Sequence, residues 1–169
     1  MYWAEMKKNI FDLGMDGWWL DSTEPDHLSF KESDLELPTA DGSFRSVRNA
    51  YPLLGVEGLY DNQRAHTSDR RVCILTRSAY TGQQRTGANV WSGDIQSTWH
   101  SLRCQIPAGL GFALTGNPNF NTDLGGFFAN PYNDRGKFGS AVHNPKFQEL
   151  YVRWTQYGIF SPMMRSHGT

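Results

Sequence analysis

Apolar residues recur at helical spacing in several segments of the chain, and glycine or proline residues punctuate those segments. Trp3, Met6, Ile10 and Leu13 follow one another at intervals of three or four, and Gly14 then stops the pattern as a helix C-cap does. The same kind of spacing predicts a helix from about residue 49, one over 97–114 that is kinked or broken at its proline, and one over 145–156.

Short, continuous apolar runs lie between these helices and predict buried strands. The runs cover residues 15–20, 71–77, 88–91 and 157–162, and residues 119–124 form a further strand or loop. Single strands that alternate with helices are typical of a parallel α/β architecture.

Polar residues that are suited to catalysis follow the predicted strands. They are Asp21, Arg77, Asp94, Asp123 and His167. In a (β/α)8 TIM barrel the residues after the strands form the catalytic face. Because roughly five strands are too few to close such a barrel, we expect residues 1–169 to be a partial catalytic domain, about the C-terminal half of a barrel in a longer enzyme.

Composition narrows the range of partners. Hydrophobic residues make up 38% of the chain and aromatic residues 14%, which is enough for a substantial core. A net charge of −1 gives no basic surface for nucleic acid, and neither a polybasic patch nor a long apolar run indicates a membrane partner. The sequence leaves the location open between the cytoplasm and the periplasm of a bacterium.

The sequence predicts neither a metal site nor a cofactor. The five histidines are scattered, and no pair of cysteines or histidines has the spacing of zinc ligands. No glycine-rich phosphate-binding motif follows a strand, which argues against a phosphate-binding protein. Cys73 and Cys104 lie in apolar segments and are expected to be buried thiols.

Two acidic segments, residues 17–26 and 91–94, each place an aspartate at the end of a tryptophan-containing stretch. A pair of carboxyl groups can cleave a glycosidic bond, one acting at the anomeric carbon and the other protonating the leaving oxygen. An indole ring can cover the apolar face of a pyranose. Taken singly, either aspartate could be a helix cap or a solvated loop residue, but together they predict a glycosidase.

The same segments resemble the motifs of glycoside hydrolase family 31. Residues 19–25 are similar to its nucleophile motif, W-x-D followed by two small or apolar residues and a glutamate, and residues 91–94 to its W-x-G-D acid/base motif. Residues 76–78, 116–118, 123–127 and 165–167 resemble further family segments in the expected order.

This resemblance implies a retaining α-glycosidase on a (β/α)8 barrel. It assigns Asp21 as the nucleophile and Asp94 as the general acid/base. The residues expected to bind the sugar are Arg77, Asp123 and His167 through hydrogen bonds, and Trp19, Trp91 and Phe127 as apolar walls.

The residues inside the motifs also indicate a branch of the family. The Ser22-Thr23 pair differs from the Met-Asn pair that is common in the α-glucosidase branch. Residues 82–85 and 165–169 look like those of bacterial α-xylosidases that trim xyloglucan oligosaccharides. The partner implied is therefore an oligosaccharide. An α-glucosidase or α-transglucosylase of the same family and an inactive, truncated carbohydrate-binding fragment remain as alternatives, and the oligomeric state is open.

Several of these residues also have purely structural interpretations. Arg77 could be a salt-bridge partner, Asp123 a turn former, and His167 a surface residue near the chain end. Glu24 could hold the loop that carries the nucleophile, or serve in a cap-like turn. Trp18 alternates with its neighbour across a strand and is expected to belong to the core.

Overall fold

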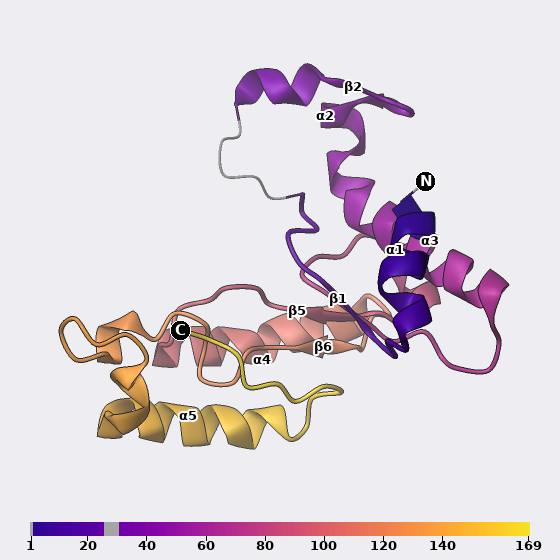
Figure 1. The fold of residues 1–169 in the computed structure, drawn as a ribbon. Helices are drawn as coiled ribbons and strands as arrows, with labels where there is room; N and C mark the ends of the chain where they lie inside the picture. The colour runs from indigo at the N-terminus through magenta and orange to yellow at the C-terminus, as the bar shows by residue number, and fades with distance from the viewer. Residues whose placement is uncertain (1, 26–30) are drawn as a thin grey trace. The chain divides into compact units, whose positions relative to one another are not determined.

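The computed structural model describes residues 2–25 and 31–169 and divides into two compact units, Met1–Ala88 and Asn89–Thr169 (Figure 1). The end of the first acidic segment, including Asp26, lies outside the described residues. The two units are described one after the other.

The first unit contains a pair of parallel strands with helices on either side of them in sequence. Its strands and α-helices are α1 (Tyr2–Asn9), β1 (Trp18–Leu20), β2 (Pro38–Thr39), β3 (Gly42–Ser43), α2 (Phe44–Val47), α3 (Tyr51–His66) and β4 (Ile74–Thr76). Short 3₁₀ helices cover Phe11–Leu13, Glu32–Glu36, Arg48–Ala50 and Gln83–Thr86. Strand β1 pairs in parallel with β4, so that Leu20 lies opposite Thr76. The carboxyl ends of both strands therefore meet at one edge.

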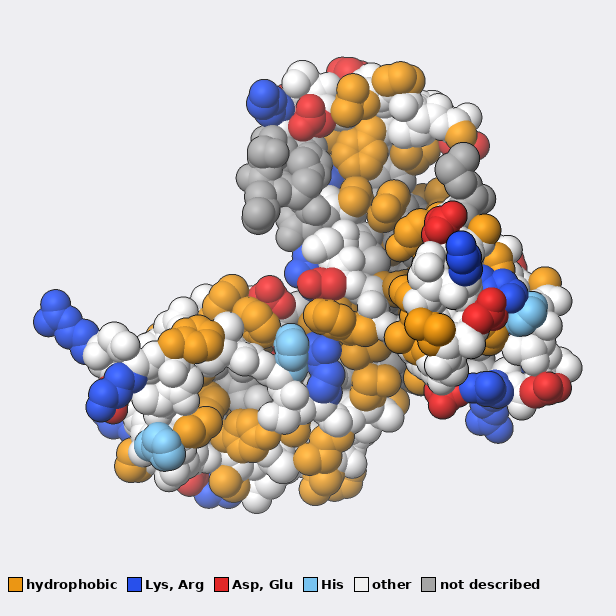
Figure 2. All heavy atoms as spheres, viewed as in Figure 1, with side chains coloured by type: hydrophobic (Ala, Val, Ile, Leu, Met, Phe, Trp, Pro, Cys, Tyr) orange, Lys and Arg blue, Asp and Glu red, His pale blue; other side chains and the backbone are white. Residues whose placement is uncertain are grey.

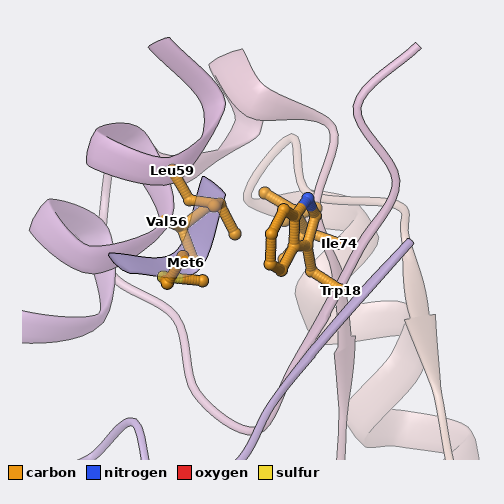
Figure 3. Close-up of a cluster of buried hydrophobic side chains, with 6 residues drawn as sticks. Met6, Trp18, Val56, Leu59 and Ile74 are labelled. Atoms are coloured by element: carbon orange, nitrogen blue, oxygen red, sulfur yellow. The ribbon is translucent and has the colours of Figure 1, made fainter. Parts of the chain in front are cut away.

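The core of this unit forms where α1 and α3 pack against β1 and β4 (Figure 3). Met6, Val56, Leu59 and Ile74 surround the indole of Trp18, which exposes only 6% of its surface. The Trp18 indole N–H donates a 2.7 Å hydrogen bond to a buried glutamine side chain, so its polar group is satisfied inside the core. The assignment of Trp18 to the core is confirmed.

The second unit also contains a parallel pair of strands and two long helices. Its elements are β5 (Asn89–Trp91), α4 (Trp99–Leu114), β6 (Phe120–Asn121) and α5 (Pro145–Gly158), with 3₁₀ helices at Asn130–Tyr132 and Ser140–His143. Strand β5 pairs with β6, with Trp91 opposite Asn121. The side chains of Thr98 and Asn144 cap α4 and α5 by accepting backbone N–H hydrogen bonds.

The predicted last strand, residues 157–162, is wrong. Helix α5 continues to its last residue, Gly158, where a side chain would collide with Leu124, and residues 159–162 form turns and bends. The extended pairing comes later in the chain: Asp123 and Arg165 form a parallel bridge, and Leu124 N–H donates to the Arg165 carbonyl at 3.1 Å.

Two other expectations need correction, and one element was not predicted. The helix predicted over 97–114 is α4, which runs through Pro107 without a break. The antiparallel β2–β3 hairpin was not predicted, because its strands are two residues each and carry no apolar alternation. Cys73 and Cys104 are free thiols as expected, but both are exposed.

Exposed apolar side chains occur on both units, interspersed with charged groups (Figure 2). Within the part of the chain that the structure describes, no helix combines the length and the apolar character needed to cross a bilayer.

Candidate functional site

In the first unit, the parallel register places Asp21 and Arg77 side by side. Asp21 follows β1 and Arg77 follows β4, each by one residue. The backbone N–H of Arg77 donates to the Leu20 carbonyl at 3.2 Å, which continues the pairing to this point. Arg77 Nη1 lies 2.9 Å from Asp21 Oδ1. A guanidinium and a carboxylate at this distance form an ion pair.

Glu24 holds the other side of the same guanidinium. Arg77 Nε donates to Glu24 Oε1 at 2.8 Å, and Nη2 donates to Oε2 at 2.9 Å. The Arg77 side chain is 12% exposed, whereas the Asp21 side chain is 43% exposed. Arg77 is thus an inner group with a fixed plane, and solvent or a ligand can reach the carboxylates on either side of it, Asp21 at 43% and Glu24 at 37% exposure.

A pocket of about 520 Å³ opens in front of Asp21 within the first unit. Trp19 lines it and exposes 52% of its surface, while Tyr51 and Leu54 of α3 line it from the helix side. The volume lies in the range of small-ligand sites, roughly 300–1,000 Å³. A carboxylate beside an open indole face matches the arrangement expected for a sugar.

In the second unit, Asp123 is wholly buried after β6 and is bound to an arginine from the chain end. Arg165 Nη2 donates to Asp123 Oδ1 at 2.6 Å, and the guanidinium lies 4.9 Å from the ring centroid of Trp91. Burial raises the pKa of the Asp123 carboxyl above its usual range, and the ion pair with Arg165 opposes that rise. Asp123 Oδ2 has no hydrogen-bond partner among the described residues.

His167 and Asp94 also act on Asp123 electrostatically. The charge of His167 lowers the Asp123 pKa and that of Asp94 raises it, so the three groups share one neighbourhood within this unit. The imidazole of His167 lies 5.4 Å from the ring of Phe127, centroid to centroid. Asp94 is exposed.

Two glycines, Gly126 and Gly168, allow backbone segments of the second unit to pack directly against each other. Gly126 has a φ of +82°, and a Cβ there would lie 2.8 Å from the Ser97 Cα. The loop that follows β6 therefore packs directly against the backbone that follows Asp94. A Cβ at Gly168 would lie 2.9 Å from the Phe127 carbonyl oxygen, and the Thr169 N–H donates to that oxygen at 2.8 Å. These contacts set His167 beside Phe127.

The structure thus groups the predicted site residues within each unit. Trp19, Asp21 and Arg77 lie together in the first, and the second holds Trp91, Asp94, Asp123, Phe127 and His167. Trp91 is only 2% exposed, beneath Arg165, and its role as a sugar-facing wall stays a prediction.

Sequence reasoning did not assign a role to Arg165 and left Glu24 open between two roles. Both make ion pairs with predicted site residues. Their positions inside the quoted motifs, three residues after Asp21 and two before His167, were the available signal. Among residues 2–25 and 31–169, no three His, Cys, Asp or Glu side chains are gathered as a metal site would require.

Comparison with known proteins gives a consistent assignment. The glycosyl hydrolases family 31 TIM-barrel domain matches residues 1–169. An alpha-xylosidase of Saccharolobus solfataricus is 41% identical over 100% of this chain and 22% of its own length. Alpha-glucosidase 2 of Bacillus thermoamyloliquefaciens is 31% identical over 98% of this chain and 20% of its own length.

Solved structures agree with this. The family 31 alpha-xylosidase of Xanthomonas citri superposes with a TM-score of 0.88 at 40% identity, covering 99% of this chain and 18% of that one. A family 31 alpha-xylosidase from a soil metagenome, complexed with xylose, gives 0.82 at 38% identity, covering 99% and 23%. The chain spans about a fifth of the length of these proteins. It belongs to glycosyl hydrolase family 31 and forms part of that family's TIM-barrel domain.

Proposed function

We propose that this chain is the catalytic-barrel segment of a longer protein, called the whole protein below, and that the whole protein is a retaining α-glycosidase. The observation that carries the proposal is the Asp21–Arg77 pair at the carboxyl ends of parallel strands, in a chain of family 31. Catalytic groups of TIM barrels lie at that edge.

The reaction proposed is a double displacement. The Asp21 carboxylate attacks the anomeric carbon, and the Asp94 carboxylic acid gives its proton to the departing glycosidic oxygen. In the second half, Asp94 takes a proton from water, and that water displaces Asp21 from the sugar. The ion pair with Arg77, at 2.9 Å, orients the Asp21 carboxylate.

The remaining predicted residues are proposed to bind the sugar in the cleavage subsite. Arg77 and His167 would donate hydrogen bonds to hydroxyl groups, and Asp123 would accept one through Oδ2, which is buried and has no hydrogen-bond partner among the described residues. Trp19 is the predicted wall that lies in the first unit, and it exposes 52% of its surface. The partner of the whole protein is accordingly an oligosaccharide.

The proposed substrates are terminal α-xylosides of the xyloglucan type. Similarity over essentially the whole chain to alpha-xylosidases, at 41% and 40% identity, supports this choice. An α-glucosidase or α-transglucosylase is the second candidate, supported by the 31% identity to Alpha-glucosidase 2. Xylose lacks the hydroxymethyl group of glucose, and a pocket that discriminates on one such group gains about 1–3 kcal/mol.

The test is hydrolysis by the purified whole protein of matched α-xylosides and α-glucosides, with the configuration of the first-formed sugar followed by NMR. We expect a higher kcat/KM for the α-xyloside and a product that is first released as the α-anomer. A preference for the α-glucoside would select the second candidate, and release of the β-anomer would exclude the retaining mechanism.

A further inference from the structure

The loop that carries Asp21 is anchored to β4 by a cluster of hydroxyl groups. Thr23 Oγ1 lies 3.0 Å from Thr76 Oγ1 and accepts a hydrogen bond from Ser78 Oγ at 2.8 Å. Thr76 is wholly buried within β4. The cluster therefore ties the loop to a strand whose position is set by the core, not to a surface segment.

Glu24 provides a second anchor through the guanidinium of Arg77. Its two oxygens accept from Nε and Nη2, and this two-point contact fixes the plane of the guanidinium. With that plane fixed, Nη1 is held 2.9 Å from Asp21 Oδ1. The orientation of Arg77 toward Asp21 thus depends on Glu24.

Between Asp21 and these two anchors lies a residue with an unfavourable backbone conformation. Ser22 has a φ of +56°, a left-handed conformation that residues other than glycine rarely adopt. Its N–H donates to Asp21 Oδ1 at 2.8 Å. Such a conformation persists only where the surroundings enforce it, and the neighbouring contacts of Thr23 and Glu24 supply that enforcement.

We infer that Glu24 and Thr23 are positioning residues that fix the Asp21 carboxylate, Glu24 through Arg77 and Thr23 through the Ser22 turn. The inference rests on the proposed function, in which Asp21 attacks the anomeric carbon. An attacking oxygen that is displaced by about 1 Å loses roughly 100-fold in rate, because the reacting atoms must be aligned.

The test follows covalent trapping of the whole protein by a ring-fluorinated α-xylosyl fluoride. In this reaction an oxygen of Asp21 forms a bond to the anomeric carbon while the bond between that carbon and its fluorine breaks. Fluoride leaves with the bonding electron pair, and the ring fluorine stays on the sugar. We expect Glu24→Gln to lower the first-order trapping rate constant about 10- to 100-fold. The concentration for half-maximal trapping should rise by a smaller factor than the rate constant falls, since Glu24 affects sugar binding only through Arg77 in this scheme.

Glu57→Gln is the matched control. Glu57 pairs with Arg85 at 3.1 Å in the same unit, and the pair includes no residue of the Asp21 loop. The control loses an ion pair of the same kind and should trap at the unmodified rate. If it slows as much as Glu24→Gln, or if Glu24→Gln stays within about twofold of the unmodified protein, the inference is wrong.

Thr23 gives an independent test that does not depend on how well Glu24→Gln folds. Thr23→Val keeps the shape and removes the hydroxyl, and we expect about 3- to 10-fold slower trapping. Thr23→Ser keeps the hydroxyl and should restore the rate, whereas equal rates for the two variants would overturn the role of Thr23. If Asp21→Ala still forms the covalent adduct, the proposed function fails instead, so the two failures are distinguishable.

Discussion

Arg77 Nη1 lies 2.9 Å from Asp21 Oδ1, and the two residues directly follow the paired strands β4 and β1. The pair arises from the parallel register itself, since Leu20 lies opposite Thr76 and the next residue on each strand carries one charge. Backbone pairing thus sets the position of the predicted nucleophile, and Glu24 and Thr23 refine it.

Removing the Asp21 carboxylate should abolish turnover. In the whole protein, Asp21→Ala is expected to lower kcat by roughly 10⁴-fold or more, since the covalent step then has no nucleophile. Steady-state assays with an aryl α-xyloside measure this, with Asp12→Ala as a control at an exposed aspartate of the same unit. Near-normal rates for Asp21→Ala would show that the nucleophile is another group.

Asp94→Ala should show a loss that depends on the leaving group. Substrates with a poor leaving group need protonation, and we expect these to lose about 10²- to 10⁴-fold in kcat/KM. An α-glycosyl fluoride or a nitrophenyl α-glycoside needs little protonation and should largely retain its kcat/KM. A uniform loss across leaving groups would contradict the acid role of Asp94.

Asp123 should make stability depend on pH. Burial raises its pKa in the folded state, so the folded protein binds this proton more tightly than the unfolded chain. The free energy of unfolding should therefore fall as the pH rises from the ordinary aspartate pKa, about 3.9, through the raised value. Asp123→Asn should flatten the fall, as measured by urea unfolding at several pH values. If Asp123→Asn leaves the pH dependence of the free energy of unfolding unchanged, Asp123 does not have a raised pKa in the folded protein.

Gly126 and Gly111 should respond to alanine in opposite directions. Gly126→Ala places a side chain against the Ser97 backbone at a φ of +82°, and we expect it to lower the free energy of unfolding by about 2 kcal/mol or more. Gly111 lies in α4 with open space around it, so Gly111→Ala should raise that free energy by about 0.5–1 kcal/mol. Thermal or urea unfolding measures both. Equal effects would show that the close approach at Gly126 is absent in solution.

The 169-residue chain by itself should have little or no activity. A TIM-barrel site uses loops from all eight strands, and this chain covers about a fifth of the length of its relatives. Its turnover of an aryl α-xyloside, compared with that of the whole protein at equal concentration, tests this. Robust turnover by the chain alone would overturn it.

The sequence predicted the elements whose patterns are local. The helices around Met6 and Val56 and the strand at Trp18 came from apolar spacing, because each buries one face in the core. The strand prediction for residues 157–162 was wrong because aromatic and branched residues there resemble a strand. In the structure, helix α5 extends to Gly158, which packs against Leu124.

The sequence indicated candidate site residues but not the contacts that they make. Motif order indicated Asp21, Arg77 and Asp123. No local sequence pattern reveals that Glu24 forms an ion pair with Arg77, 53 positions away. The pairing of Arg165 with Asp123, 42 positions apart, likewise depends on the pairing of the chain end with the segment after β6. Such contacts are set by tertiary structure.

The most direct test of the central claim is the distance between the Asp21 and Asp94 carboxylates in a crystal structure of the whole protein. We predict about 5–6 Å, with both groups facing one cleft beside Trp19 and Arg77, as a retaining mechanism requires. A separation of about 7–9 Å, the spacing of inverting enzymes, or carboxylates that face different surfaces, would contradict the account.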